Sequence, residues 1–290
     1  MPTQLEAVAG RSWDAVVVGA GPAGALAARE LARRGRSVLL VDKARFPRYK
    51  VCGCCLNARA LSALDAVGLG GLAGRLGGIP LHTVLVGRCG HRIGVRLPGG
   101  MAVSREAFDA ALVDAAREAG VTVLTETTGF AGSPDTDSRN VQLRRRDAVL
   151  ETTTRLVIAA DGLGGRLLRE QGFDSPAQEE SRVGAGVVAE AAPDTYEPGI
   201  IHMACGAGGY VGLVRIEDGR LNIAAAFALG FMKGAGGMGP AAAAVLESAG
   251  FPSVPDLNAL SWRGTPALTR RATLVSAPRG CVLGDAAGYV

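Results

Sequence analysis

Short apolar runs alternate with helical stretches at the start of the chain. Val16 to Val18 is a β-branched run that predicts a strand, and Val38 to Val41 predicts a second one. An alanine-rich stretch with helical character lies between them and ends at Gly35. Two strands joined by a helix form a βαβ unit with parallel strands. This opening pattern therefore predicts the beginning of a parallel sheet.

The turn after the first strand is rich in glycine. It reads Gly19-Ala20-Gly21-Pro22-Ala23-Gly24. The first glycine permits the tight turn, the second lets the backbone approach a pyrophosphate, and the third lets the helix pack closely on the strand. Asp42, 23 positions after the first glycine, ends the second strand and is placed to accept hydrogen bonds from an adenosine ribose. We expect all of these residues to bind a dinucleotide; the alternative is a turn whose glycines serve packing alone.

The next segment carries basic residues and three cysteines. It reads KARFPRYKVCGCCLN from Lys43 to Asn57, and we expect it to run alongside the dinucleotide from Lys43 onward, with the cysteines near the far end. Cys52 and Cys55 form a CxxC pattern, which is typical of a redox dithiol, although these cysteines can equally be small residues packed beside a flat ring. A structural zinc site needs four ligands, and no second CxxC or histidine pair follows.

Strands that alternate polar and apolar positions indicate a different kind of sheet. The predicted strands of this kind are 82–86, 92–97, 183–191, 200–204, 210–216 and 221–227. Cys89-Gly90 and Asp218-Gly219 are hairpin turns between them. Antiparallel hairpins do not belong to a parallel dinucleotide-binding sheet, so these segments predict a second domain.

Helices and further strands lie between and after these alternating strands. The pattern predicts helices over 57–67, 104–120 and 240–248, a hairpin with arms at 141–146 and 148–153, and separate strands at 155–160 and 279–284. The strand 155–160 is fully apolar, as in a sheet that is buried on both faces, and it ends at a second glycine-rich turn that contains Asp161 and Gly162. Asp285 begins a further predicted helix.

Composition narrows the classes of function. The chain has 31 basic and 27 acidic residues in a scattered arrangement, with a formal net charge of +4, so nucleic acid is not an expected partner. The start of the chain lacks a signal-peptide pattern, and no apolar run approaches the roughly 18 residues that span a bilayer. The cysteine pattern does not resemble a secreted disulfide framework. We expect a soluble protein of the cytoplasm without a resident metal.

Three motifs follow one another along nearly the whole chain. They are GAGPAG at 19–24, ADG at 160–162 and GDAAG at 284–288. In this order they resemble the superfamily of FAD-dependent monooxygenases and geranylgeranyl reductases, which has the para-hydroxybenzoate hydroxylase fold. The segment 46–53, FPRYKVCG, is similar to the FPRxKVCG segment of geranylgeranyl-reductase-like proteins.

The resemblance implies FAD as the cofactor and NAD(P)H as a transient reductant. The turn 19–24 and Asp42 would hold the ADP half, and Arg105 would lie by the flavin and its phosphates. Gly284 and Asp285 would contact the ribityl chain or the pyrophosphate.

Two further sites follow from the same resemblance. Asp161 and Gly162 match a motif linked to FAD and to passing NAD(P)H. Cys52 would lie beside the flavin, where it is the candidate proton donor of an alkene reductase.

The resemblance and the alternating pattern together predict an α/β fold. A βαβ (Rossmann-like) FAD-binding domain, residues 1–78, 101–175 and 276–290, would be interleaved with a substrate domain of antiparallel sheet plus helix, residues 79–100 and 176–275. Members of the superfamily continue past GDAAG with a helical region. We therefore expect a chain that is truncated at its C-terminal end.

The sequence departs from the superfamily in two places. Geranylgeranyl reductases carry YxWxFPK and flavin halogenases WxWxIP in a substrate-domain strand, whereas residues 209–215 read GYVGLVR and lack the aromatic wall. Cys54 stands where relatives with a VCGG motif have glycine. The first departure argues against halogenation and weakens the case for reduction of a prenyl chain.

The sequence leaves the function open between several classes. The leading prediction is an FAD-dependent oxidoreductase acting on a hydrophobic small molecule, either as a monooxygenase that uses NAD(P)H and O2 or as an alkene reductase. A non-catalytic flavin- or nucleotide-binding protein is the alternative from another class. A disulfide reductase is disfavoured, because the cysteine spacing is too narrow and no complete second dinucleotide turn follows. The oligomeric state is open, and peripheral contact with a membrane is compatible with a hydrophobic substrate.

Overall fold

The chain folds into two compact units. The computed structural model describes residues 8–165, 167, 173 and 176–289. Unit 1 comprises Met1–Arg48, Asp109–Gln178 and Thr269–Val290, and unit 2 comprises Tyr49–Phe108 and Glu179–Leu268. Each unit has its own large sheet and its own hydrophobic core.

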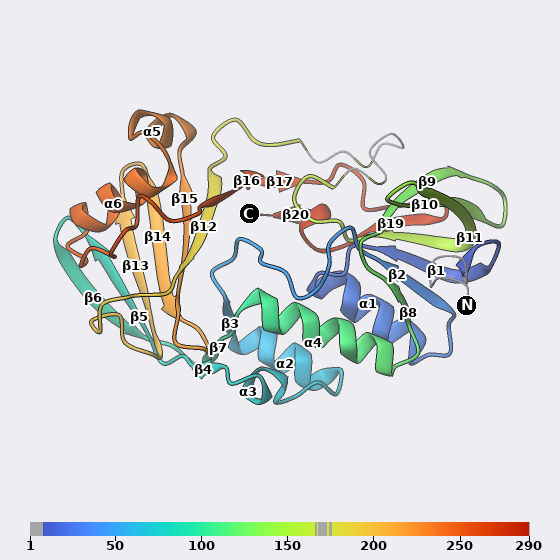
Figure 1. The fold of residues 1–290 in the computed structure, drawn as a ribbon, viewed down its shortest axis with the longest axis horizontal. Coiled ribbons are helices and arrows are strands. Elements are labelled where there is room, and N and C mark those ends of the chain that lie inside the picture. The colour runs from blue at the N-terminus through green and yellow to red at the C-terminus, as the bar shows by residue number, and fades with distance from the viewer. Residues whose placement is uncertain (1–7, 166, 168–172, 174–175, 290) are drawn as a thin grey trace. The chain divides into compact units, whose positions relative to one another are not determined.

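Unit 1 is built on a mixed eight-stranded sheet (Figure 1). Its strands are β1 (Ser12–Val18), β2 (Val38–Val41), β8 (Thr122–Leu124), β9 (Thr128–Pro134), β10 (Arg139–Arg145), β11 (Ala148–Ala159), β18 (Ser276–Ala277) and β19 (Gly280–Val282). The order is β18-β19-β11-β1-β2-β8, with β10 and β9 continuing from β11. Strands β19, β11, β1, β2 and β8 run parallel. The opening βαβ pattern predicts this for β1 and β2.

Two helices of this region begin in different ways. Helix α1 (Pro22–Ala32) packs on β1 and β2 and starts with Pro22, whose missing N–H costs nothing at that position. Helix α4 (Arg105–Glu118) is capped by Ser104, whose Oγ accepts a hydrogen bond from the backbone N–H of Ala107 at 3.1 Å. The boundary between the two units falls within α4.

Strand β11 is longer than the pattern predicts. The arm 148–153 and the strand 155–160 form one continuous strand, because its first part pairs antiparallel with β10 and its last part pairs parallel with β1. Two residues of the polar run that suggested a break are buried: Thr152 and Thr154 are 1% and 0% exposed. Their hydroxyls donate to the carbonyls of Arg11 and Leu156, so threonine satisfies its polar atom inside the sheet.

The predicted helix at Asp285 is wrong. Residues Gly284–Ala286 form a single 3-10 turn, and β20 (Gly288–Tyr289) then pairs antiparallel with β17 (Arg270–Arg271). This pairing directs the chain into an extended conformation, which prevents the turn from continuing as a helix.

Unit 2 contains a seven-stranded sheet in the order β16-β12-β15-β14-β13-β5-β6. Its strands are β5 (Thr83–Arg88), β6 (His91–Arg96), β12 (Val183–Ala189), β13 (Ile200–Gly206), β14 (Gly209–Arg215), β15 (Leu221–Phe227) and β16 (Arg263–Ala267). A small second sheet consists of β3 (Cys55–Asn57), β7 (Gly100–Ala102) and β4 (Ile79–Pro80), and the helices are α2 (Ala58–Ala66), α3 (Leu72–Arg75), α5 (Leu229–Gly234) and α6 (Met238–Ser248). Both hairpins predicted for this sheet, at Cys89-Gly90 and at Asp218-Gly219, are confirmed.

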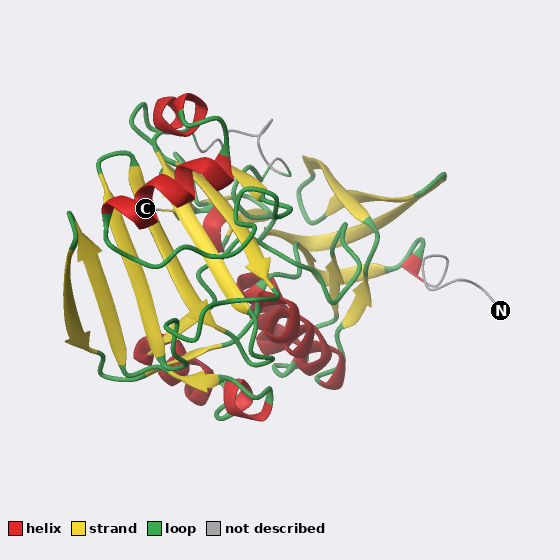
Figure 2. Cartoon of the chain, turned by 60° about the vertical axis from the view of Figure 1, so that its left-hand side comes forward, coloured by secondary structure: helices red, strands yellow, loops and turns green. Residues whose placement is uncertain are grey.

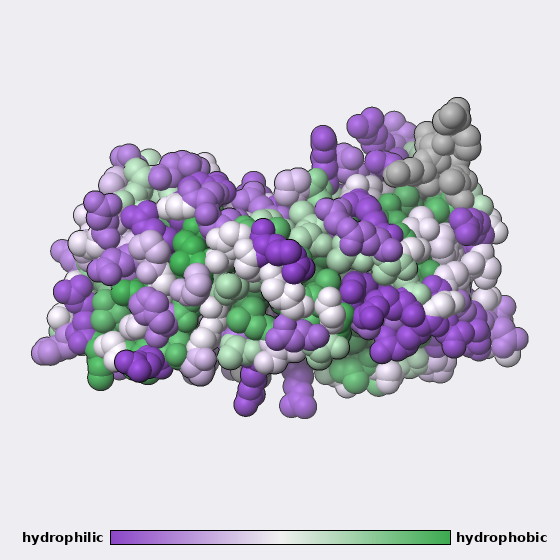
Figure 3. Space-filling view, turned by 90° about the horizontal axis from the view of Figure 1, so that it is seen from below, coloured by the Kyte–Doolittle hydropathy of each residue, from purple (hydrophilic) through white to green (hydrophobic). Residues whose placement is uncertain are grey.

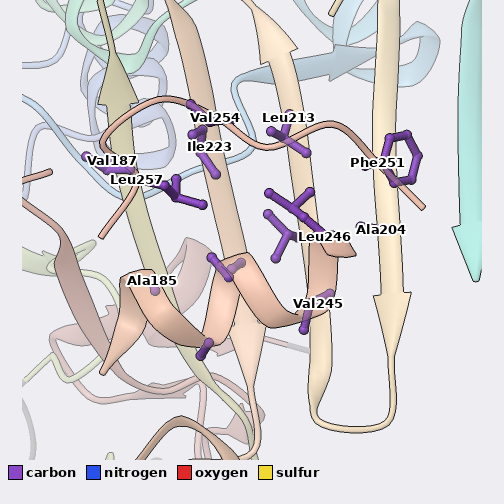
Figure 4. Packing of buried hydrophobic residues seen from close by; sticks show 14 of the residues in the cluster. Ala185, Val187, Ala204, Leu213, Ile223, Val245, Leu246, Phe251, Val254 and Leu257 are labelled. Carbon is purple, nitrogen blue, oxygen red and sulfur yellow. The ribbon is translucent and has the colours of Figure 1, made fainter. Parts of the chain in front are cut away.

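Helix α6 lies across one face of the seven-stranded sheet (Figure 2). Figure 4 shows Val245 and Leu246 of this helix beside Leu213 and Ile223 of the sheet, and all four are at most 2% exposed. The opposite face of the sheet carries the alternate side chains of the same strands. One face of the sheet therefore packs in the hydrophobic core with α6, and the other face does not contact this helix.

The predicted fold class is confirmed: the protein is α/β, with parallel and antiparallel sheets. Residues 49–78 and 101–108 belong to the same compact unit as the antiparallel sheet. The division into an FAD-binding domain, 1–78, 101–175 and 276–290, and a substrate domain is a functional one and stays a prediction.

The surface seen in Figure 3 carries small apolar areas separated by polar side chains, which agrees with the scattered charge of the sequence. In the part of the chain that the structure describes, every helix is too short or too polar to cross a membrane.

Candidate functional site

The structure brings the three sequence motifs together at one edge of the sheet of unit 1. Strands β1, β11 and β19 are neighbours and run parallel, so the turns that follow their carboxyl ends meet. The backbone N–H of Ala160 donates to Val18 O, and that of Leu283 donates to Ala159 O, both at 2.8 Å. In α/β sheets this edge is where ligands bind.

Two glycines of the first motif are required by backbone contacts. Gly19 has φ +106°, and a Cβ there would lie 2.2 Å from the carbonyl oxygen of Ala160. A Cβ on Gly24 would lie 1.8 Å from the carbonyl oxygen of Gly19. Since these neighbours are backbone atoms, no side chain can be accommodated at either position. The first and second motifs are thus packed directly against each other.

The start of α1 is suited to hold an anion. Its N-cap residue, Gly21, provides no side-chain hydrogen bond to the first turn, and the first turn has no acidic residue. The backbone N–H groups of a helix start have no partner within the helix, and the helix dipole favours negative charge there. Gly284 of the third motif is close by, because a Cβ on it would lie 2.8 Å from Ala23 Cβ. These residues fit the pyrophosphate of a dinucleotide such as FAD.

Asp42 is buried and already has two hydrogen bonds. Its carboxylate accepts from the backbone N–H of Ala20 at 2.7 Å and from that of Ala44 at 2.8 Å. The acid therefore braces the glycine-rich turn from the end of β2. A carboxylate has about four acceptor positions, so contact with a ribose stays a prediction. The side chain of Lys43 is exposed.

The second and third motifs also form tight turns with few side-chain contacts. Asp161 accepts a hydrogen bond from the backbone N–H of Leu167 at 3.2 Å, and a Cβ on Gly165 would lie 2.3 Å from its Oδ1. Gly162 is buried with φ +82°. Asp285 lies in the 3-10 turn and is half-buried. Their predicted contacts with FAD stay predictions.

An ion pair that the sequence did not reveal fixes the segment after β2. Arg48 Nη1 lies 3.2 Å from Oδ2 of Asp109, whose side chain is 0% exposed, and the Arg48 guanidinium also stacks over the ring of Phe46 at 4.8 Å. The partners are far apart in sequence, and no spacing rule connects them. Within the FPRYK segment, Arg48 thus serves as an anchor to α4.

The cysteine segment belongs to unit 2, where it lies beside β15 and the start of α4. The side-chain amide of Asn222 donates to the carbonyl oxygen of Cys52 at 2.9 Å, and the N–H of Val103 donates to Cys54 O at 3.0 Å. The backbone N–H of Cys54 points at the Cys52 sulfur, with 3.4 Å between N and Sγ. All six cysteines of the chain are free thiols.

The surroundings of Cys52 favour its charged form. A hydrogen bond from the Cys54 side chain, helped by the positive charge of Arg105, holds the pKa of the Cys52 thiol below its ordinary value despite burial. The same hydrogen bond and burial raise the pKa of Cys54. Cys55 does not pair with Cys52: it is exposed, and its Sγ donates to the Gly53 carbonyl at 3.1 Å. The partner of Cys52 is therefore Cys54, and the CxxC spacing is misleading.

Arg105 and Cys52 are thus neighbours within unit 2. The predicted position of both beside the flavin stays a prediction.

One face of the seven-stranded sheet carries a row of apolar residues. Paired positions on neighbouring strands run from Gly186 through Ala224, Gly212 and Met203 to Val86. Directly paired residues point to the same side of a sheet, so this row forms a continuous strip on the side opposite α6. From Ala224 to Val86 the strip is partly exposed. Such a surface suits an apolar ligand.

Comparison with known proteins agrees with these features. The model of a family described as FAD binding domain matches residues 12–214. Menaquinone reductase of Mycobacterium tuberculosis is 38% identical over 168 residues, which cover 56% of this chain and 40% of that protein. Digeranylgeranylglycerophospholipid reductase 1 of Methanopyrus kandleri is 34% identical over 190 residues, which cover 64% of this chain and 49% of that protein. The matches thus span less than half the length of these relatives.

Solved structures show the same fold. A myxobacterial chondrochloren halogenase superposes with a TM-score of 0.81 at 19% identity, covering 97% of this chain and 69% of that one. A geranylgeranyl bacteriochlorophyll reductase-like protein of Thermoplasma acidophilum superposes with a TM-score of 0.76 at 19% identity, covering 96% and 72%. At this identity the likeness concerns the fold alone.

Proposed function

Because the chain belongs to the FAD-binding domain family of oxidoreductases, we propose that it forms part of a reductase that acts on a carbon–carbon double bond of a hydrophobic, isoprenoid-bearing substrate. NAD(P)H is the proposed reductant. The sequence left reduction and oxygenation equally open. The relatives now favour reduction, since those that match over more than half of this chain include menaquinone and digeranylgeranylglycerophospholipid reductases.

The observation that carries the proposal is the apolar strip of unit 2. It consists of aliphatic and small residues on the free face of the sheet, and Met203 supplies a flexible side chain that adapts to irregular apolar shapes. The carbonyl of Cys52 is bound to Asn222, which lies on β15 in the cross-strand row next to the strip. The cysteine pair is therefore held at the border of a surface that can receive an isoprenoid chain.

The residues that would hold FAD are those of the motif turns in unit 1. The N–H groups at the start of α1 would bind the pyrophosphate, and Gly19 and Gly24 allow the backbone to come close enough. Bound FAD would supply the exchange of a hydride. Asp42 keeps the turn in place through Ala20.

Saturation of a double bond also requires a proton, and the cysteine pair is the proposed source. With Cys52 as a thiolate, the proton shared by the two sulfurs resides on Cys54. Cys52 can act as the predicted donor once it has received that proton. After transfer both sulfurs are thiolates, and Arg105 compensates one of their two negative charges until the pair takes up a proton from solvent.

The test uses the full-length protein loaded with FAD. It is incubated without oxygen with NADPH or NADH and either menaquinone or a geranylgeranyl lipid, and the products are analysed by mass spectrometry. A reductase of the double bond yields a product whose isoprenoid chain carries two additional hydrogens, which fragmentation distinguishes from reduction of the quinone ring. If product forms only when oxygen is admitted, and carries label from 18O2, the protein is a monooxygenase and the proposal is wrong. Bound FAD without any product would indicate a nucleotide-binding protein.

A hydrophobic substrate also bears on where the protein works. We propose a cytoplasmic protein that contacts a membrane peripherally to reach such a substrate. Co-sedimentation with vesicles that contain the lipid substrate, compared with vesicles that lack it, measures this contact. Equal absence from both pellets would contradict it.

A further inference from the structure

Cys54 occupies a backbone conformation that disfavours every residue with a side chain except a few polar ones. Its φ is +57°, in the left-handed region, and the residue is 6% exposed. A non-glycine residue there costs about 1–3 kcal/mol, and strained residues of this kind cluster at functional sites. Glycine would remove this cost. Of the non-glycine residues with positive φ in the described part of the chain, Cys54 is the one that is buried, so its side chain has a role inside the protein rather than in an exposed turn.

The reason suggested by the geometry is contact with Cys52. The backbone nitrogen of Cys54 lies 3.4 Å from Cys52 Sγ, and its N–H donates a hydrogen bond to that sulfur. Cys54 also lies close to the start of the 14-residue helix α4, because its carbonyl oxygen accepts a hydrogen bond from the backbone N–H of Val103 at 3.0 Å, two residues before the helix begins at Arg105. The two cysteines thus lie together near a helix start, and the positive charge of Arg105 acts on the Cys52 sulfur. These are the surroundings in which cysteine thiolates become reactive.

We propose that Cys52 and Cys54 form a redox-active CxC pair that reacts with hydrogen peroxide and closes to a disulfide. Cys52 is the attacking sulfur and Cys54 the resolving one. This site does not depend on the proposed reduction of a double bond.

The chemistry balances with peroxide as the only oxidant. The Cys52 thiolate attacks one peroxide oxygen, the O–O bond breaks, and Cys52 becomes a sulfenic acid while hydroxide leaves. The Cys54 sulfur then attacks the sulfenic sulfur, and the S–S bond forms as water leaves with the Cys54 proton. Two sulfurs are oxidised by two electrons in total, and one peroxide is reduced.

The groups that face the pair explain why the first sulfur is charged. Arg105 of α4 supplies positive charge, and along the segment itself Tyr49 and Cys55 are the other titratable neighbours. Burial raises the pKa of Tyr49, so the phenol stays neutral and does not oppose the thiolate at ordinary pH. The lowered pKa of Cys52 means that its thiolate persists as pH falls through the range in which an ordinary thiol, with a pKa of about 8.5, becomes protonated.

The test begins with peroxide treatment of the full chain, followed by alkylation of the remaining thiols and mass spectrometry of the peptide 51–59, which contains all three cysteines. We expect one disulfide in this peptide and one alkylated cysteine, Cys55. At pH 6, before oxidation, Cys52 should react with iodoacetamide at least about tenfold faster than Cys55, because only the thiolate is nucleophilic.

Three variants identify the partners. Cys54→Gly suits the left-handed backbone and should fold; it should lose the disulfide and leave a sulfenic acid at Cys52 that dimedone traps. Cys52→Ser should lose both products. The matched control, Cys55→Ser, should form the disulfide as the unmodified chain does. A disulfide that survives in Cys54→Gly and disappears in Cys55→Ser would assign the reaction to the CxxC pair and overturn the proposal, as would the absence of any disulfide in the unmodified chain.

Discussion

Two glycines, Gly24 of unit 1 and Gly212 of unit 2, serve opposite purposes. In unit 1 a Cβ on Gly24 would lie 1.8 Å from a backbone oxygen, so the position is closed to any side chain. In unit 2 a Cβ on Gly212 would lie 3.3 Å from Cε of Met203, the mobile end of a flexible side chain. The first glycine builds a rigid turn for a ligand with a fixed shape. The second leaves room on a surface that can adjust.

The two glycines also differ in whether a substitution can be tolerated. A backbone atom is held by its own hydrogen bonds and cannot move without disturbing the strand, whereas a methionine can change rotamer at small cost. We expect substitutions in the turn to abolish cofactor binding and substitutions on the sheet face to change which substrate binds.

Gly24→Ala is the strongest test of the rigid half. The added methyl overlaps the carbonyl of Gly19, so we expect a loss of more than about 4 kcal/mol in the free energy of unfolding or a complete loss of bound FAD. Denaturant unfolding and FAD content of the purified protein measure both. Gly230→Ala in α5 is the control, since nothing lies within 4 Å of a Cβ there. If Gly24→Ala keeps FAD and stability, the contact does not limit the turn.

Asp42→Asn should have the next largest effect. Asparagine keeps one acceptor oxygen but presents an NH2 group to one of the two backbone N–H donors, so one charge-assisted bond is lost at about 1.5–3 kcal/mol. We expect this loss in the unfolding free energy of the FAD-free protein, because both observed bonds lie within the protein.

The affinity for FAD provides the second readout of the same variant. If FAD dissociates more readily by more than the change in stability explains, the predicted ribose contact exists. If affinity is unchanged while stability falls, Asp42 acts only as a brace of the turn.

The sequence could predict the features that depend on backbone geometry, but not those that depend on contacts formed in the folded protein. The turn 19–24 was predictable because the backbone geometry of this turn requires its glycines, and that geometry is the same in every protein that contains the turn. The length of β11 was not, since Thr152 looks polar until its hydroxyl finds a carbonyl inside the sheet. The partner of Cys52 was also hidden: the CxxC spacing pointed to Cys55, whereas the N–H that donates to the Cys52 sulfur belongs to Cys54, whose backbone is left-handed.

On the sheet face of unit 2, two glycines of one row allow a graded test. A Cβ on Gly186 would lie 2.7 Å from the Tyr49 hydroxyl and 3.0 Å from a methyl of Val51, so Gly186→Ala should cost about 1–3 kcal/mol by overpacking. Gly212→Ala should cost less than about 1 kcal/mol, since Met203 can move aside. Thermal unfolding of the two variants side by side measures the difference. Equal costs would mean that the face is as rigid as the turn.

We expect the smallest change in stability at a helix start, and the starts of α1 and α4 differ in their capping. Gly21 leaves the first turn of α1 without a side-chain cap, whereas Ser104 caps α4 and also donates from its Oγ to Glu217 at 2.5 Å. For the cap alone, Ser104→Ala should lower the free energy of unfolding by about 1 kcal/mol and Ser104→Gly by only a few tenths. Both variants lose the Oγ bond to Glu217, so the difference between them isolates the cap.

The affinity for FAD decides what this difference means. The first turn of α4 has part of its N–H groups satisfied by the protein, through Ser104 Oγ, so both variants should bind FAD as the unmodified chain does. The start of α1 has no such cap, and its N–H groups are left for a ligand. A fall in FAD affinity in Ser104→Ala beyond the loss of stability would show that the start of α4 serves the cofactor as well, in agreement with the predicted role of Arg105.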